Sequence, residues 1–314
     1  MALRLGSRGS PLAMAQSYLV QEMLANAANE SVDAFPIVKF TTTGDRIQDQ
    51  RLQNIGGKGL FTKELDEALA DNRIDAAVHS MKDLPTKLPE GQVLACVPSR
   101  EDPRDAFVSL KSPTLMALRP GSTIGTASLR RQAQTLNIRP DLRVVTLRGS
   151  VHTRLKRLGE GDIDGTFLAL AGLTRLGLAS VASSIMSSKL MPPAPGQGAI
   201  AVTCRADDHA TRNTLAGLSV ARFEIATSAE RAFLDALDGS CRTPIGAFAT
   251  VEGDTLSFVC EVLSPDGVSR WRRKATIFLD SNPHAKADAL GRELGREVRA
   301  EAGARFQVAP LTAW

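Results

Sequence analysis

The sequence is poor in the residue types that metal centres, disulfide frameworks and base-stacking surfaces require. Its 314 residues include four Cys and four His, with no CxxC, HxxxH or HxH pair among them. Neither a metal site nor a disulfide scaffold is therefore expected, and a reducing cytoplasm is the expected compartment. Aromatic residues make up 4% of the chain. Platforms for stacking nucleic-acid bases are missing, which argues against a nucleic-acid partner.

Long apolar runs are also absent. No stretch approaches the roughly 18 apolar residues needed to span a bilayer, and the residues after Met1 lack the apolar core of an export signal. Neither membrane association nor export is expected. Hydrophobic residues at 43% and charged residues at 23% are typical of a folded chain. The length suggests two or three domains at roughly 100–200 residues each.

Arginine is present in excess. The chain has 28 Arg against 10 Lys, although its net charge is only +4. Between residues 130 and 157 there are seven Arg and one Lys, and Asp141 is the only acidic residue. Arg is favoured where carboxylates or phosphates are held by two parallel hydrogen bonds. Because this stretch lacks the carboxylate partners of a salt-bridged surface, it predicts a binding site for a small polyanion.

Strand-like apolar runs alternate with helix-like stretches along most of the chain. Ser10 is placed to cap a helix that begins at Pro11. A strand is expected at 76–79, and continued alternation would put His79, Met81 and Asp83 on one side. Repeated strand–helix units predict an α/β fold, whose ligands bind beyond the carboxyl ends of the strands. Residues 101–191 repeat this strand–helix pattern. Four of their polar residues lie at such strand ends, namely Arg130, Arg131, Arg148 and Ser150.

Two further regions have a different pattern. Residues 44–59 are polar and show no hydrophobic periodicity, which predicts a mobile loop that could act as a lid. Phe61 and Leu65 then begin the apolar face of a helix. From residue 221 onward, a helix, three hairpin-like strands and a closing helix predict a small α+β domain.

Cys241 differs from the other cysteines in its surroundings. It lies among turn residues beside Arg242, whose charge favours the thiolate, whereas Cys96 and Cys260 lie in apolar runs. No His is adjacent to act as its base, so a cysteine hydrolase is not indicated. An inert cysteine near a turn remains the alternative to a reactive one.

Asp83 follows the strand at 76–79 and adjoins Lys82. A catalytic carboxylate is one interpretation, and a turn residue before Pro85 is the other, since Asp is common in such turns. The sequence Gly56-Gly-Lys-Gly59 does not have the spacing of a phosphate-binding Walker loop, so it does not predict a nucleotide site.

Seven blocks occur in an order that resembles the porphobilinogen deaminase family, also called hydroxymethylbilane synthases. The resemblance covers nearly the whole chain. The blocks are Ser7-Arg-Gly-Ser-Pro-Leu-Ala13, Gly56-Gly-Lys-Gly-Leu-Phe-Thr-Lys-Glu64, His79-Ser-Met-Lys-Asp-Leu-Pro-Thr86, Gly125-Thr-Ala-Ser-Leu-Arg-Arg-Gln132, Arg148-Gly-Ser-Val-His-Thr-Arg154, Ala194-Pro-Gly-Gln-Gly-Ala199 and Gly239-Ser-Cys-Arg-Thr-Pro-Ile-Gly246. Small departures are Ser150, where Asn is usual, and Thr203, where Glu is frequent.

The resemblance implies a fold and an activity. The fold is α/β, with two lobes like those of periplasmic binding proteins around a cleft and a small C-terminal α+β domain. The implied domains are 1–96 together with 197–216, then 101–191, then 221–314. The activity joins four porphobilinogen molecules head to tail with loss of ammonia, giving linear hydroxymethylbilane for tetrapyrrole and haem biosynthesis. The implied protein is a cytoplasmic monomer.

The resemblance also implies the site residues. Asp83 is the catalytic carboxylate, and Cys241 carries a covalent dipyrromethane cofactor through a thioether. Lys58 and Phe61 belong to the lid. The residues implied to bind cofactor and substrate carboxylates are Arg8, Ser10, Lys82, Ser128, Arg130, Arg131, Arg148, Ser150, Arg154 and Arg175.

A non-enzymatic receptor for polycarboxylates is the alternative from another functional class. Two αβ lobes around a cleft are also the architecture of solute-binding proteins, so the fold alone does not separate the two functions. The covalent cofactor does separate them, because a receptor carries no covalent adduct.

Overall fold

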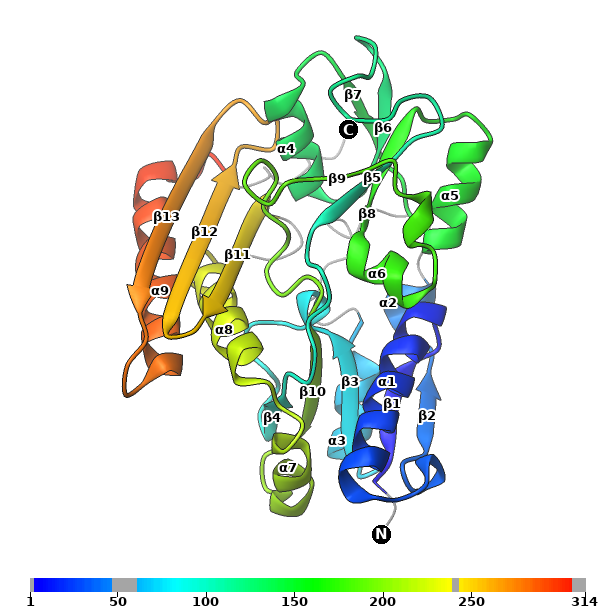
Figure 1. Cartoon of the computed structure of the whole chain (residues 1–314), viewed down its shortest axis with the longest axis vertical. Helices are drawn as coiled ribbons and strands as arrows, with labels where there is room; N and C mark the ends of the chain where they lie inside the picture. The colour runs from blue at the N-terminus through cyan, green and yellow to red at the C-terminus, as the bar shows by residue number, and fades with distance from the viewer. Residues whose placement is uncertain (1–2, 47–60, 239–242, 307–314) are drawn as a thin grey trace.

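The computed structural model describes residues 3–46, 61–238 and 243–306, and within them the chain forms three β-sheets (Figure 1). Two sheets are five-stranded with parallel and antiparallel pairs, and the third is three-stranded and antiparallel. The predicted α/β class with a small α+β part is confirmed. In the part of the chain that the structure describes, no helix is long and apolar enough to cross a membrane.

The first sheet has a strand from late in the chain inserted into it. Its elements and the helices around it are β1 (Leu5–Arg8), α1 (Pro11–Ala28), η1 (Val32–Ala34), β2 (Ile37–Phe40), α2 (Thr43–Arg46), α3 (Lys63–Ala70), β3 (Ala76–Ser80), η2 (Met81–Asp83), β4 (Gln92–Cys96), β10 (Ile200–Arg205) and α7 (His209–Ala216). The strand order is β2-β1-β3-β10-β4, with β1 parallel to both neighbours and β10 antiparallel to β3 and β4. Val20 and Leu24 of α1 pack on the strands in a buried cluster.

The second sheet has the order β7-β6-β8-β5-β9. Its elements and helices are β5 (Asp105–Val108), β6 (Thr123–Gly125), α4 (Leu129–Ile138), β7 (Arg143–Val145), α5 (Val151–Gly159), β8 (Gly165–Ala169), α6 (Leu170–Arg175), η3 (Ala179–Val181) and β9 (Ser184–Ile185). β6 is parallel to β7 and β8, and β5 is antiparallel to β8 and β9. The carboxyl ends of β6 and β7 therefore face the same edge of the sheet, where α4 and α5 begin.

The third sheet is covered on one face by two packed helices (Figure 1). Its elements are α8 (Ala221–Ala236), β11 (Ile245–Glu252), β12 (Thr255–Leu263), β13 (Arg270–Phe278) and α9 (Pro283–Ala302). Glycines on α9 allow the close approach of α8, since a side chain at Gly291 would collide with the carbonyl oxygen of Ala229. A Cβ at Gly295 would lie 2.6 Å from the Cβ of Ala236.

Three local expectations are wrong. The alternation expected from His79 to Asp83 stops at Ser80, because Met81–Asp83 form the 3₁₀ turn η2, which the Leu84 N–H closes by donating to the Met81 carbonyl. Phe61 precedes α3 instead of lying on its apolar face. The expected loop from 44 to 59 overlaps a short helix, α2, whose last three residues are the first three of the polar run. The rest of that loop, residues 47–59, lies outside the described residues.

A buried carboxylate joins the three sheets. Glu230 of α8 is 0% exposed, and its oxygens accept from Gly196 N at 2.7 Å and from Ala249 N at 2.8 Å. It also pairs with Arg100, whose Nη1 lies 2.8 Å from Oε1. Two segments of the chain cross between the first and second sheets. Arg100 lies on the first, between β4 and β5, and Gly196 lies on the second, between β9 and β10. Ala249 lies on β11 of the third sheet. One side chain therefore fixes both crossings to α8.

Replacing Glu230 with Ala is expected to lower the free energy of unfolding by about 3–5 kcal/mol, because the buried Arg100 guanidinium loses its counterion. Urea unfolding measures the change. Glu293→Ala on the exposed face of α9 is the matched control, with an expected change below about 0.5 kcal/mol. Equal losses in the two variants would contradict this account of the junction.

Candidate active site

Three serines of the predicted binding set begin helices of the first and second sheets. Ser10, Ser128 and Ser150 are the N-caps of α1, α4 and α5, and each side-chain oxygen accepts a backbone N–H of the first turn. The predicted cap at Ser10 with Pro11 in the first turn is confirmed. A capping hydroxyl accepts through its oxygen and has an O–H that can donate to a ligand. Helix N-termini also favour anions.

Arg130 and Arg131 have a carboxylate partner that the sequence pattern does not reveal. Both are buried, at 5% exposure. Arg130 Nη1 lies 2.7 Å from Asp105 Oδ2, and Arg131 Nη2 lies 2.7 Å from Asp105 Oδ1. The expectation that the arginine stretch lacks carboxylate partners is therefore wrong, because Asp105 comes from β5, outside residues 130–157. Burial alone raises the pKa of Asp105, but the two guanidinium groups hold that pKa below its ordinary value.

Lys82 and Asp83 of the first sheet lie beside this cluster of the second sheet. Lys82 Nζ donates to Gln197 Oε1 at 3.5 Å, and Gln197 Nε2 donates to Asp105 Oδ1 at 2.9 Å. Burial lowers the pKa of Lys82 to about 8; Asp83 opposes this lowering, and Arg131 adds to it. Gln197 is a site residue that the sequence motifs did not single out, although it lies in one of the seven matching blocks.

Arg148 and Arg154 add further positive charge near Arg131 in the second sheet. Arg154 Nε donates to the Gly149 carbonyl at 3.0 Å. Burial, together with the charges of Arg131 and Arg148, lowers the pKa of Arg154 to about 10. Three guanidinium groups therefore influence one another at this edge of the sheet. An anionic ligand would stabilise such a group of like charges.

The buried guanidinium nitrogens without a hydrogen-bond partner among the described residues include two in the predicted binding set. They are Nε of Arg130 and Nε of Arg175. Arg175 Nη2 donates to the Gly198 carbonyl at 2.7 Å, and burial lowers the pKa of Arg175. A buried donor without a partner costs free energy, so each of these atoms is a position where a ligand oxygen would be stabilised.

Arg8 and Phe61 form a contact between the predicted binding set and the predicted lid. The Arg8 guanidinium carbon lies 4.3 Å from the centroid of the Phe61 ring, a cation–π geometry. The other lid residue, Lys58, lies outside the described residues.

Cys241 also lies outside the described residues, but the other three cysteines are described and buried. Burial raises the pKa of Cys96 to about 12, of Cys204 to about 11 and of Cys260 to about 12. Thiols with such pKa values are protonated near neutral pH and react poorly. None of these three cysteines is a good candidate for attaching a cofactor.

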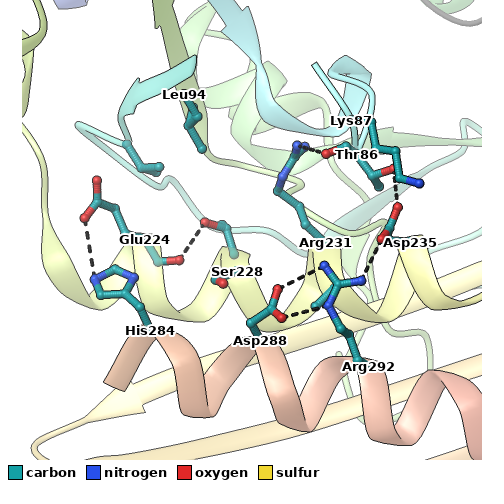
Figure 2. Close-up of a pocket in the computed structure, with 13 residues that line it drawn as sticks. Thr86, Lys87, Leu94, Glu224, Ser228, Arg231, Asp235, His284, Asp288 and Arg292 are labelled. Carbon is teal, nitrogen blue, oxygen red and sulfur yellow. Dashed lines mark hydrogen bonds and ion pairs between the residues drawn. The ribbon is translucent and has the colours of Figure 1, made fainter. Parts of the chain in front are cut away.

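A cavity of about 400 Å³ lies on another part of the surface, between α8, α9 and the segment after Asp83 (Figure 2). None of the predicted binding residues lines it. Several of its charged residues pair with one another, as Arg292 does with Asp235 and Asp288. The cavity is therefore separate from the group formed by Lys82, Arg130, Arg131 and Asp105.

Comparison with known proteins covers almost the whole chain. Residues 3–213 match the family model described as "Porphobilinogen deaminase, dipyromethane cofactor binding domain", and residues 225–300 match "Porphobilinogen deaminase, C-terminal domain". The chain is 51% identical over 310 residues to the porphobilinogen deaminase of Caulobacter sp. (strain K31), covering 96% of both chains. It is also 51% identical to that of Phenylobacterium zucineum (strain HLK1), covering 96% of this chain and 97% of that protein.

Solved structures similar to this chain include the methionine binding protein MetQ and the lipoprotein Tp32 from Treponema pallidum. MetQ has a TM-score of 0.43 at 14% identity and covers 71% of this chain and 89% of its own. Tp32 has a TM-score of 0.44 at 11% identity, with coverages of 69% and 89%.

The lowered pKa of Lys82 predicts a pH dependence of stability. Between about pH 8 and the ordinary value of 10.5, the unfolded chain binds more protons at this residue than the folded chain. The free energy of unfolding therefore rises with pH in this window on account of Lys82. We expect Lys82→Met to remove that rise. Both proteins are compared by urea unfolding at pH 7.5 to 10.5 in a Cys241→Ala background, which lacks the sulfur predicted to carry a cofactor. A stability difference independent of pH would contradict the prediction.

Proposed function

The chain belongs to the porphobilinogen deaminase family, and from that premise we propose that Asp83 stabilises the reacting pyrrole while Cys241 attaches the cofactor. The protein is an enzyme that condenses porphobilinogen into hydroxymethylbilane, and it contains a dipyrromethane cofactor-binding domain. Membership of an enzyme family leaves the receptor alternative without support. The class of reaction is thus established.

The residues around Asp105 fit a cofactor and substrate that carry many carboxylates. The observation that supports this proposal is the pair of buried nitrogens without partners, Nε of Arg130 and Nε of Arg175, among the described residues. The clustered charges of Arg131, Arg148 and Arg154 support it further. When bound, the dipyrromethane supplies the pyrrole to which the first substrate is joined. We propose that the side chains holding its carboxylates and those of the substrate are Arg8, Ser10, Lys82, Ser128, Arg130, Arg131, Arg148, Ser150, Arg154 and Arg175.

Asp105 gives the two central arginines a fixed geometry. Arg131 donates through Nε and Nη2 to Asp105 and through Nη1 to the Phe167 carbonyl. A guanidinium group has five N–H donors, so Arg131 still has donors for a ligand carboxylate after these bonds are made. Because Asp105 and Phe167 hold the group in place before binding, less conformational entropy is lost when the ligand arrives.

Asp83 has the chemistry that the reaction requires. Departure of ammonia from porphobilinogen leaves positive charge on the pyrrole ring, and the ring is again positive while the new carbon–carbon bond forms. A carboxylate near the ring N–H stabilises both charged states. Asp83 is half-buried and adjoins Lys82 at the boundary between the first and second sheets. It can also accept the proton that the ring carbon loses.

We further propose that the three sheets correspond to three domains, formed by residues 1–96 with 197–216, 101–191 and 221–314. The strand order supports this division, since β10 lies in the first sheet although it follows the second in the chain. We also propose that the enzyme acts as a cytoplasmic monomer and that the loop at residues 44–59 forms its lid, to which Lys58 and Phe61 belong.

The proposed attachment predicts the mass of a cysteine variant. Cys241→Ala is expected to lack the dipyrromethane adduct and nearly all activity, because the thioether has no sulfur to form on. Intact-protein mass spectrometry compares the measured mass with the mass of the sequence. Cys260→Ala, a change at a buried thiol, is the control and should keep the adduct. Full adduct mass in Cys241→Ala would disprove the attachment.

Asp83→Asn is expected to keep its dipyrromethane, or a longer bound oligopyrrole, and to turn over slowly. Asn is nearly isosteric and its amide oxygen still accepts from a pyrrole N–H, so binding should survive. The missing negative charge acts only as ring charge develops, so kcat should fall by about 10²–10³-fold while KM changes little. Steady-state kinetics tests this, with Asp83→Glu expected between wild type and Asn. A near-wild-type kcat in Asp83→Asn would return Asp83 to the role of a turn residue before Pro85.

A further inference from the structure

The segment that follows Asp83 is held by one side chain from the third sheet's helix pair. Arg231 of α8 donates to the carbonyl oxygens of Leu84, Pro85 and Thr86 at 3.4, 2.8 and 3.1 Å. No backbone N–H in the described ranges donates to these three carbonyls. The Arg231 guanidinium is therefore the main hydrogen-bonding partner of these carbonyls. The first of them belongs to Leu84, the residue directly after Asp83.

A second contact joins the same segment to the same helix. Thr86 Oγ1 donates to Asp235 Oδ1 at 3.0 Å, and Asp235 Oδ2 accepts from Arg292 of α9 at 2.7 Å. Arg292 also donates to Asp288 at 2.8 Å, so the chain of contacts runs from the segment through α8 into α9 (Figure 2). The helix pair thus holds the segment at two points, through Arg231 and through Asp235.

The cavity of about 400 Å³ described above lies beside the Leu84–Thr86 segment, so this segment depends on its polar contacts to stay in place. It opens beside Thr86, Arg231 and Asp235 (Figure 2), so this flank of the segment lacks the close packing that fixes most buried backbone. Burial lowers the pKa of Arg231, and Asp235 opposes that effect. A guanidinium group nevertheless stays charged throughout the neutral range. Its hydrogen bonds are therefore charge-assisted and stronger than those of a neutral donor.

α8 connects this contact to the proposed site of cofactor attachment. The helix ends at Ala236, shortly before Cys241 in the chain. Glu230, the residue before Arg231, fixes the segments that cross between the first two sheets. Consecutive residues of one helix therefore hold the Asp83 segment and both crossings.

We propose that Arg231 is a positioning residue for the condensation: it holds the Leu84–Thr86 segment on α8, so that the Asp83 carboxylate keeps a fixed place relative to the cofactor on Cys241. This inference rests on the proposed roles of Asp83 and Cys241. A displacement of about 1 Å in a catalytic group can slow a reaction by about 10²-fold. Loss of the Arg231 contacts should therefore reduce turnover more than substrate binding.

Arg231→Met removes the donors while keeping an unbranched side chain. The variant is expected to carry the cofactor mass, with kcat about 10- to 100-fold lower and KM within about 3-fold of wild type. Arg231→Lys restores a charged donor and should recover part of the lost kcat. Thr86→Val removes the second contact without changing charge and should lower kcat in the same direction by a smaller factor.

Arg222→Met is the matched control, since it makes the same change on the same helix. Arg222 is exposed and its guanidinium lies 4.8 Å from the Phe223 ring centroid. It makes no hydrogen bond or ion pair with the Leu84–Thr86 segment in the described part of the chain. Its kcat and KM should match those of wild type.

The Asp83→Asn background separates positioning from general damage to the fold. If Arg231 acts through Asp83, adding Arg231→Met to Asp83→Asn should lower kcat by less than about 3-fold further, because changes coupled through one group do not add. A further loss as large as that in the wild-type background overturns the inference, as does wild-type kcat in Arg231→Met. If Arg231→Met does not fold, Arg231→Lys and Thr86→Val are compared in both backgrounds under the same criteria.

The outcomes also separate this inference from the proposed function. Slow turnover in Asp83→Asn, combined with additive effects of Arg231→Met, would remove the positioning role alone. Wild-type turnover in Asp83→Asn would remove the proposed role of Asp83 and the positioning inference with it.

Discussion

Glu230 lies at the point where the three sheets meet, and the relative placement of all site residues depends on its contacts. Its carboxylate is fully buried, pairs with Arg100 and accepts the Gly196 and Ala249 N–H groups. A buried carboxylate without such partners would be strongly destabilising. The chain therefore has to bring both crossing segments to α8 in order to bury this group, and the edges of the first two sheets are placed beside each other as a result.

The site formed between those edges has more positive than negative charge. Asp105 neutralises part of the charge of Arg130 and Arg131, and the pKa values of Lys82 and Arg154 are lowered by burial and by neighbouring cations. Under the proposed function, the carboxylates of the substrate and the cofactor would balance this charge. Guanidinium groups held rigidly by Asp105 would bind them with little reorganisation, so the internal ion pair and the proposed ligand binding are compatible.

Features that depend on interactions between neighbouring residues were predicted correctly from the sequence. The Ser10 cap with Pro11, the helix after Ser128 and the buried state of Cys96 and Cys260 all followed from neighbouring residues. The continued alternation after His79 failed because the chain closes the turn η2 before Pro85. Strand periodicity carries no information about where a strand ends in a turn.

The sequence by itself determined the α/β class and the family to which the seven blocks belong, and its Arg excess led to the prediction of a polyanionic ligand. Only the tertiary structure decided that Asp105 pairs with the two central arginines, that Gln197 bridges Lys82 to Asp105, and that Arg231 holds the segment after Asp83. The physical reason is distance along the chain. These partners lie on segments that are distant from each other in the chain, and hydrogen bonds between such segments leave no periodicity or spacing in the sequence from which they could be predicted.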